Sequence, residues 1–172
     1  MILPKARDPR FITIRRGGSL SDEMHYLLAL WAADCAEHVL HYFESEHPED
    51  NRPRQAIEKT RLWARGIINA TESKEAAYYS NKAAQGSKGP ARMAAYSAGQ
   101  AAVVAHVPLH ELGAAAYAIR AVIEASEKEL IEYNKQRENE WQKGKLPGEI
   151  KELVLEDEIN RNEICWNVFS IQ

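Results

Sequence analysis

The stretch that decides the fold is LLALWAADCAEHVLHYFE, residues 27–44. Most of its side chains are apolar, but at about 100° per residue its polar side chains fall within one stripe of a helix. The polar stripe consists of Asp34, Glu37, His38, His41 and Glu44, and the apolar stripe opposite consists of Leu28, Ala32, Cys35, Val39 and Tyr42. A helix this hydrophobic is normally buried, so its acids and histidines must find partners inside the protein or line a cavity.

The composition is that of an ordinary globular protein, with 45% hydrophobic and 27% charged residues among 172. A chain of this length is one domain by the usual prior and can bury a core. The formal net charge of −3 disfavours a nucleic-acid binder, which usually carries a basic excess. The N-terminus lacks a signal-peptide core, and no run approaches the ~20 apolar residues of a membrane span. We therefore expect a cytoplasmic protein, with reduced, buried thiols at Cys35 and Cys165.

Helical periodicity and helix-breaking residues divide the rest of the chain. Residues 1–20 contain Pro4, Pro9 and the β-branched run FITIRR, which predict an extended arm with at most one short strand. The expected helices are 21–45 (capped by Ser19 or Ser21), 53–85, 91–106, a segment that starts near Pro108, the charged segment 126–145, and a last helix from about 148. We interpret 126–145 as a solvated extension of the helix before it.

Short loops favour antiparallel neighbours. The prediction is therefore an all-α, antiparallel bundle of five or six helices in a single domain with an extended N-terminal arm. The arm covers residues 1–20, the main helices cover 21–145, and a C-terminal helix and tail cover 146–172. The tail ICWNVFSIQ is apolar enough that we expect it to dock on the body.

The second expected helix carries a charged stripe of its own, formed by Arg54, Glu58, Arg61 and Arg65. If the first two helices form an antiparallel hairpin, Glu44 lies near Arg54. In the same register, Asp34 or Glu37 should contact Arg61 or Arg65. We interpret the two stripes as an interhelical ion-pair network that fixes the pairing of the helices. The alternative is a polar pocket in which the arginines hold a carboxylate or a phosphate.

Two histidine pairs offer a weaker hypothesis, a metal site. The pairs are His38 with His41, spaced i, i+3, and His106 with His110, spaced i, i+4. Asp34 and Glu37 would complete a carboxylate-rich site between helices, but none of these four histidines has the preceding Glu-x-x spacing of ferritin-like sites. Pro108 also separates the second pair. We expect no cofactor and keep a divalent metal as the less favoured alternative.

Nucleophilic catalysis is disfavoured by the sequence. The chain contains no GxSxG, P-loop, GxGxxG, CxxC or HExxH motif. Cys35 lies one helical turn before His38, so a thiolate–imidazole pair is geometrically conceivable. Its apolar surroundings should raise the thiol pKa and suppress the reactive thiolate.

Three segments carry a family resemblance: DPRFITIRRGGSLSDEMHYLLALWAADCAEHVL, DNRPRQAIEKTRLWARG and AAYSAGQAAVVAHVPLHELGAAAYA. They resemble a helical family of small prokaryotic proteins labelled Imm-5-like immunity proteins, some of which carry an exonuclease-type name. The resemblance implies an all-helical protein with a binding role, and it supplies no catalytic residues. The exonuclease name finds no support in the residues, because no acids are arranged for two metals and no nucleotide loop is present.

Three functions follow from these patterns. The leading one is a non-enzymatic binding protein, for which the family resemblance implies an immunity protein that neutralises a toxin by direct binding. Acidic helices such as 126–140 and 149–158 suit a basic partner. The alternative is a metal-dependent enzyme or small-ligand-binding protein that uses the Asp/Glu/His/Arg cluster between helices. The third is a homo-oligomer in which the alanine-rich segment 91–125 packs against its copy. None of the three involves nucleic acid or a membrane.

Overall fold

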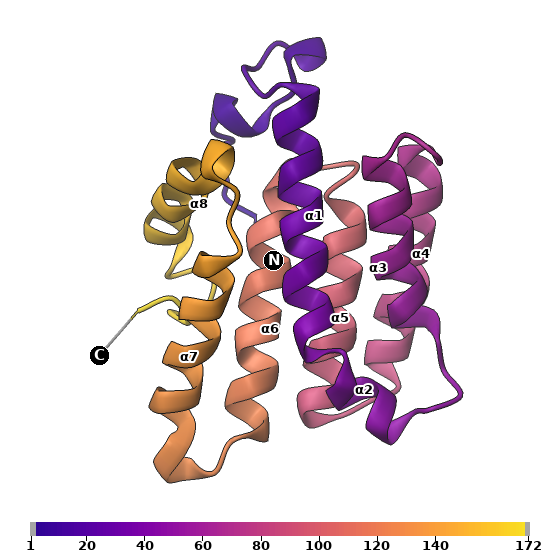
Figure 1. Ribbon diagram of the computed structural model, residues 1–172, viewed down its shortest axis with the longest axis vertical. Coiled ribbons are helices and arrows are strands. Elements are labelled where there is room, and N and C mark those ends of the chain that lie inside the picture. The colour runs from indigo at the N-terminus through magenta and orange to yellow at the C-terminus, as the bar shows by residue number, and fades with distance from the viewer. Residues whose placement is uncertain (1–2, 171–172) are drawn as a thin grey trace.

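The computed structural model describes residues 3–170, and within them it contains helices and no strand (Figure 1). The α-helices are α1 (Asp22–Val39), α2 (His41–Glu46), α3 (Arg52–Ala64), α4 (Ala70–Gln85), α5 (Gly89–Val103), α6 (Glu111–Ala125), α7 (Ile131–Gly144) and α8 (Gly148–Arg161). The predicted all-α bundle is confirmed. It has more helices than the expected five or six because the chain also breaks at Leu40, after Ala64 and after Ala125.

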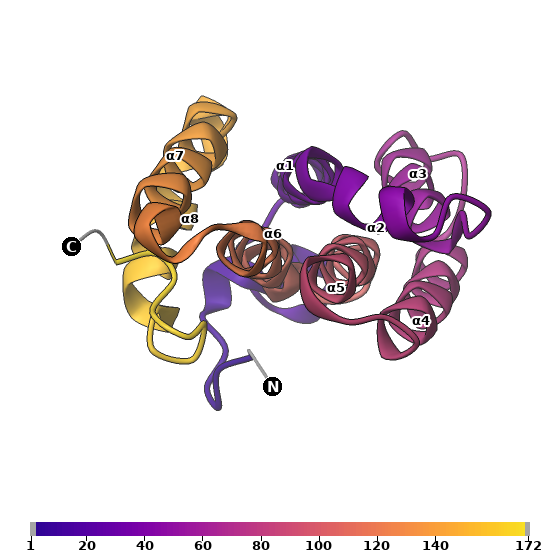
Figure 2. The same cartoon turned by 90° about the horizontal axis from the view of Figure 1, so that it is seen from below.

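Helix α5 lies at the centre of the bundle and packs against α1, α2, α3, α4 and α6. Seen along the helix axes, α3 and α4 lie on one side of α5, and α7 and α8 lie beyond α6 on the other side (Figure 2). The N-terminal arm covers the end of the bundle at which α1 begins (Figure 1). No helix among residues 3–170 is both long and apolar enough to cross a membrane.

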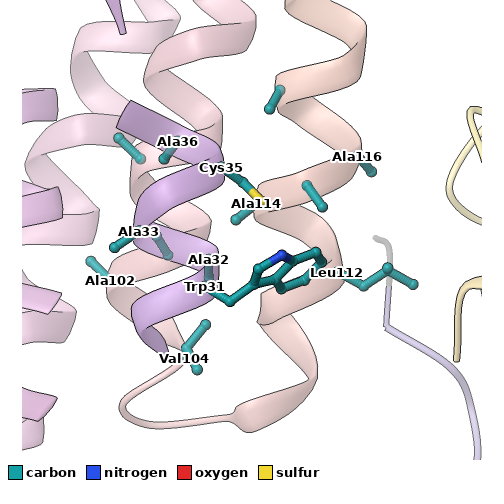
Figure 3. Packing of buried hydrophobic residues seen from close by; sticks show 14 of the residues in the cluster. Trp31, Ala32, Ala33, Cys35, Ala36, Ala102, Val104, Leu112, Ala114 and Ala116 are labelled. Carbon is teal, nitrogen blue, oxygen red and sulfur yellow. The ribbon is translucent and has the colours of Figure 1, made fainter. Parts of the chain in front are cut away.

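Small side chains let the central helices approach closely. Trp31 and Cys35 of α1 point toward α6, where alanines leave room for them (Figure 3). Three buried serines donate their hydroxyl protons to backbone carbonyls of the next helix: Ser73 to Ala102, Ser80 to Ala95, and Ser97 to Ala114. The alanine-rich face that the homo-oligomer hypothesis required is therefore buried inside the bundle.

The first expected helix, 21–45, is divided at Leu40. Ser21 caps α1 by accepting from the Met24 N–H, as predicted. At Leu40 the backbone N–H bonds to the carbonyl of Glu37 at 3.2 Å, three residues back instead of four. The ring of His41 donates to the carbonyl of His38 at 3.2 Å. The side chain thus satisfies an acceptor at the point where the helix breaks.

The prediction of one continuous helix over 53–85 was wrong, because the chain forms two helices there, α3 and α4. Gly66 has φ of +73°, a left-handed conformation that ends α3. Asn69 then starts α4 with a capping box, in which its side chain and that of Glu72 bond each other's backbone N–H at 3.0 Å. The local signal Asn-x-x-Glu after a glycine was present in the sequence and would have located the break.

The interpretation of 126–145 as a solvated extension was also wrong. The chain turns after Ala125, and α7 runs back along α6 with Lys135, Glu138, Asn139 and Gln142 buried on its inner face. Gln142 joins α7 to its neighbours. Its side chain donates to the carbonyl of Ala115 at 3.2 Å, and its backbone carbonyl accepts from the indole of Trp31 at 2.9 Å. These two bonds satisfy the backbone carbonyl and the side-chain N–H group of Gln142, whereas Gln142 Oε1 and Asn139 Oδ1 are buried without a hydrogen-bond partner among the described residues.

Both ends of the described chain pack on the body. The arm contains two 3₁₀ turns, Pro9–Phe11 and Ile14–Arg16, and its expected strand is reduced to one bridge between Thr13 and Leu20. Gly18 is required there, because a Cβ would meet the carbonyl oxygen of Ile12. The tail docks as predicted, with Cys165, Val168 and Phe169 buried. Residues 1–2 and 171–172 of the expected arm and tail lie outside the described residues.

Candidate functional site

The predicted contact between the charged stripes of α1 and α3 is confirmed. One guanidinium nitrogen of Arg61 lies 2.8 Å from Asp34 Oδ1 and 2.7 Å from Glu37 Oε2. The hydrogen bond from Arg61 lowers the pKa of Glu37. Side-chain exposures of 24% for Arg61 and more than 40% for both acids place this network at the surface of the hairpin and not in a pocket.

The ends of the two stripes behave differently. Arg54 binds Glu44 through two hydrogen bonds of 2.5 and 2.9 Å, as the hairpin register predicted. Glu58 and Arg65 are exposed, and neither forms an ion pair within the described residues. The network therefore joins only part of the predicted cluster.

The histidines of α1 do not join this network. The Nδ1 of His38 donates to Oε2 of the buried Glu138 on α7 at 2.8 Å, and its ring stacks on Trp141. His41 is exposed and lies against Tyr42. The Asp/Glu/His/Arg cluster that the ligand-binding alternative required is thus divided between two sides of α1.

The other histidine pair is divided by Pro108, as the sequence suggested it would be. His106 is exposed, whereas His110 bonds Gln100 Oε1 at 2.7 Å. Burial and then the charge of Arg161 lower the pKa of His110 to about 4. Among residues 3–170, no three His, Cys, Asp or Glu side chains come together as a metal site would need.

Both cysteines are free and buried, which agrees with the expectation of reduced thiols. Burial raises the pKa of Cys35 well above its usual value, and it raises that of Cys165 to about 12. Neither residue is a thiolate nucleophile near neutral pH.

A buried ionic trio was missed by the sequence reasoning. Arg161 of α8 bonds Glu111 Oε1 at 3.0 Å, both oxygens of Asp157 and the carbonyl of Leu109 at 2.8 Å. Burial raises the pKa of Glu111 well above its usual value, so this carboxyl keeps its proton to unusually high pH. The signal was one acid in the otherwise apolar ELGAAAYAI, because a lone carboxyl there needs a buried partner.

A cleft of about 600 Å³ lies at the arm end of the bundle. It lies between the arm, the start of α1, the α3–α4 loop and the α5–α6 loop. We call it the arm cleft. Its floor is formed by His25, Tyr26, Trp63, Ile68 and Leu109, and its basic side chains are Arg7, Arg15, Arg16 and His106. A cleft of this size, lined by both apolar and basic side chains, can hold a ligand or part of a protein partner.

The floor of the arm cleft is held rigidly. His25 is buried, and its Nε2 donates to the carbonyl of Val104 at 2.7 Å. Trp63 stands edge-on to both His25 and Tyr26, with ring centroids 4.7 and 5.1 Å apart. Burial is the largest effect on His25 and lowers its pKa, against the opposing hydrogen bond to Val104 and the charge of Asp22, so the ring is neutral at pH 7. None of these residues was singled out from the sequence, because the cleft joins segments that are far apart in the chain.

Comparison with known proteins gives one result. A family model described as "Imm-5 like putative immunity protein" matches residues 18–149. No curated protein and no solved structure matches the chain. The matched residues include the whole floor of the arm cleft and the Arg61 network, whereas Arg7, Arg15 and Arg16 precede the match. Because the match covers more than half of its residues, the chain belongs to the Imm-5 like putative immunity protein family.

Proposed function

We propose that this protein is an immunity protein that neutralises a toxin by direct, non-covalent binding, and that the toxin docks over the arm cleft. One observation carries the proposal. Residues 25–26, 63, 66 and 105–109 are far apart in the sequence and all lie within the family match, yet they line this one cleft. A shared binding site is the simplest reason for such convergence.

The rim of the cleft has the composition of a protein interface. Ile14 and Ile67 are 63% and 62% exposed, and each is flanked in the sequence by residues that line the cleft. Exposed apolar side chains beside tryptophan, tyrosine and arginine are the combination found at binding hot spots. The floor beneath them is already rigid, so docking would cost little ordering entropy.

The test is a growth assay in cells that express a toxin encoded beside this protein's gene. The wild-type protein should restore growth and form a stable complex with the purified toxin. The double variant I14D/I67D should lose protection and weaken the complex at least tenfold, with an unchanged melting temperature. I159D is the matched control, because Ile159 is 78% exposed on α8 and does not line the arm cleft.

Two results would count against the proposal in different ways. If no complex forms with the neighbouring toxin, the immunity function is wrong. If the complex forms and I14D/I67D binds as tightly as I159D, the function stands and the docking surface is elsewhere.

A further inference from the structure

We propose that the arm cleft recognises a carboxylate-bearing segment of the protein partner, with aspartate or glutamate side chains beside an apolar one. The inference rests on the proposed function, since it specifies the chemistry of the toxin segment that enters the cleft. It reverses the expectation that the acidic helices of this protein face a basic toxin.

The charge of the cleft has a single sign. Its described lining residues include three arginines and two histidines, and no aspartate or glutamate. The whole chain, by contrast, has a net charge of −3. A concave site that opposes the charge of its own protein attracts ligands of the opposite sign, because the low-dielectric walls focus the potential.

The arginines at the cleft form few ion pairs within the described residues, unlike six of the nine arginines elsewhere. Each of six others binds a carboxylate: Arg10, Arg52, Arg54, Arg61, Arg120 and Arg161. Arg7 and Arg16 form no ion pair within residues 3–170, and Arg15 has only an exposed contact of 2.9 Å with Asp22. Their guanidinium groups can therefore bind a carboxylate without breaking a buried contact.

The ionisation of the nearby histidines agrees with a positive potential in the cleft. Burial is the largest cause that lowers the pKa of His106, and the positive charges of Lys74 and Arg16 lower it further. At His25, burial is the largest effect and lowers the pKa, and the smaller lowering effects of Arg15 and Arg16 oppose the raising effects of the Val104 hydrogen bond and the Asp22 charge. A carboxylate bound in the cleft would offset the positive potential that Lys74 and Arg16 create at His106.

The floor favours a peptide over a nucleic acid. Trp63 and Leu109 are buried, and a volume of about 600 Å³ accommodates a few side chains but not a strand of nucleotides. Nucleic-acid sites also need a basic track that extends well beyond one cleft. An apolar side chain on this floor, flanked by carboxylates on the arginines, matches both parts of the site.

The probe is the peptide acetyl-Glu-Phe-Glu-amide, titrated into the isotope-labelled protein and followed by NMR. Saturable shifts should appear at the indole of Trp63 and the rings of His25 and His106. The isosteric peptide acetyl-Gln-Phe-Gln-amide should bind at least tenfold more weakly. Raising the salt concentration from about 0.1 to 0.5 M should weaken the glutamate peptide several-fold.

Charge-reversal variants test whether the arginines of the arm cleft bind the glutamate peptide. R7E/R16E should reduce affinity for the glutamate peptide more than tenfold. R137E should change it less than twofold, because Arg137 is exposed on α7 and does not line the arm cleft. The inference is overturned if both peptides bind equally, if neither shifts the cleft signals, or if a single-stranded oligonucleotide binds these residues more tightly. If R7E/R16E still neutralises the toxin while I14D/I67D does not, this inference fails and the proposed function stands.

Discussion

His38 and Glu138 are bound to each other across 100 positions of sequence, with His38 Nδ1 2.8 Å from Glu138 Oε2. The ring of His38 also stacks on Trp141, with centroids 3.6 Å apart and an interplanar angle of 6°. Only 3% of the Glu138 side chain is exposed, so the histidine supplies a hydrogen-bond donor that solvent cannot readily replace. This contact fastens α7 to α1.

Replacing His38 should therefore lower the free energy of unfolding more than replacing His41, which lies on the same helical stripe. H38A leaves one oxygen of a buried carboxylate without its donor, which should lower the free energy of unfolding by about 1–3 kcal/mol. H41A should cost less than about 0.5 kcal/mol, because His41 is exposed. Urea denaturation measures both, and equal losses would contradict the assigned role of His38.

Arg61 in the last turn of α3 and Arg65 at its C-cap form a second matched pair. R61M removes the bridge to Asp34 and Glu37 and should cost about 1 kcal/mol, with the loss shrinking in 0.5 M salt. R65M should be nearly neutral. Because Arg61 lowers the pKa of Glu37, the advantage of the wild type over R61M is present above pH 4.5 and is lost as the pH falls further. Denaturation at several pH values would show this, and a constant difference would refute it.

Substitutions in the buried trio of Arg161, Glu111 and Asp157 should destabilise the protein far more than R61M does. R161M leaves Glu111 and Asp157 without their cation in the interior and should cost about 3–5 kcal/mol. E111Q should cost clearly less, because an amide can still accept from Arg161 and the replaced carboxyl already tends to hold a proton. Thermal denaturation of both variants gives the order. Equal stability of R161M and the wild type would show that the trio contributes nothing.

His110 should make stability depend on pH in the acid range. The unfolded histidine takes up a proton near pH 6.5, whereas the folded one does so only near pH 4. Its contribution is thus present above pH 6.5 and is lost as the pH falls toward 4, to a maximum of about 3 kcal/mol. The stability of the wild type relative to H110Q should fall across that window. H41Q is the control, because His41 is exposed.

Two glycines should respond to alanine in opposite directions. A Cβ on Gly99 would lie 2.4 Å from Asn81 Oδ1, between the closely packed α4 and α5, so G99A should cost about 1–3 kcal/mol. A Cβ on Gly144 would meet nothing within 4 Å, so G144A should gain up to about 1 kcal/mol through helix propensity. Melting temperatures would distinguish the two effects, and a stabilising G99A would contradict the packing.

The sequence by itself determined the all-α fold class and the pairing of α1 with α3. Helix geometry fixes which side chains share a stripe, and a short connection brings neighbouring helices together. The contacts of Arg61 with Asp34 and Arg54 with Glu44 could therefore be predicted. Gly66 and the capping residues Asn69 and Glu72 also indicate in the sequence that the helix breaks after α3, although the prediction did not use them.

Only the tertiary structure decided where His38 points, why α7 is buried and which segments form the arm cleft. The partners concerned are separated by 100 residues for His38 and Glu138, and by 50 for Arg161 and Glu111. A helical period gives the direction of a side chain about its own axis, but it does not say which distant helix lies there. That choice depends on how all the apolar faces pack at once, so the site became visible only in the fold.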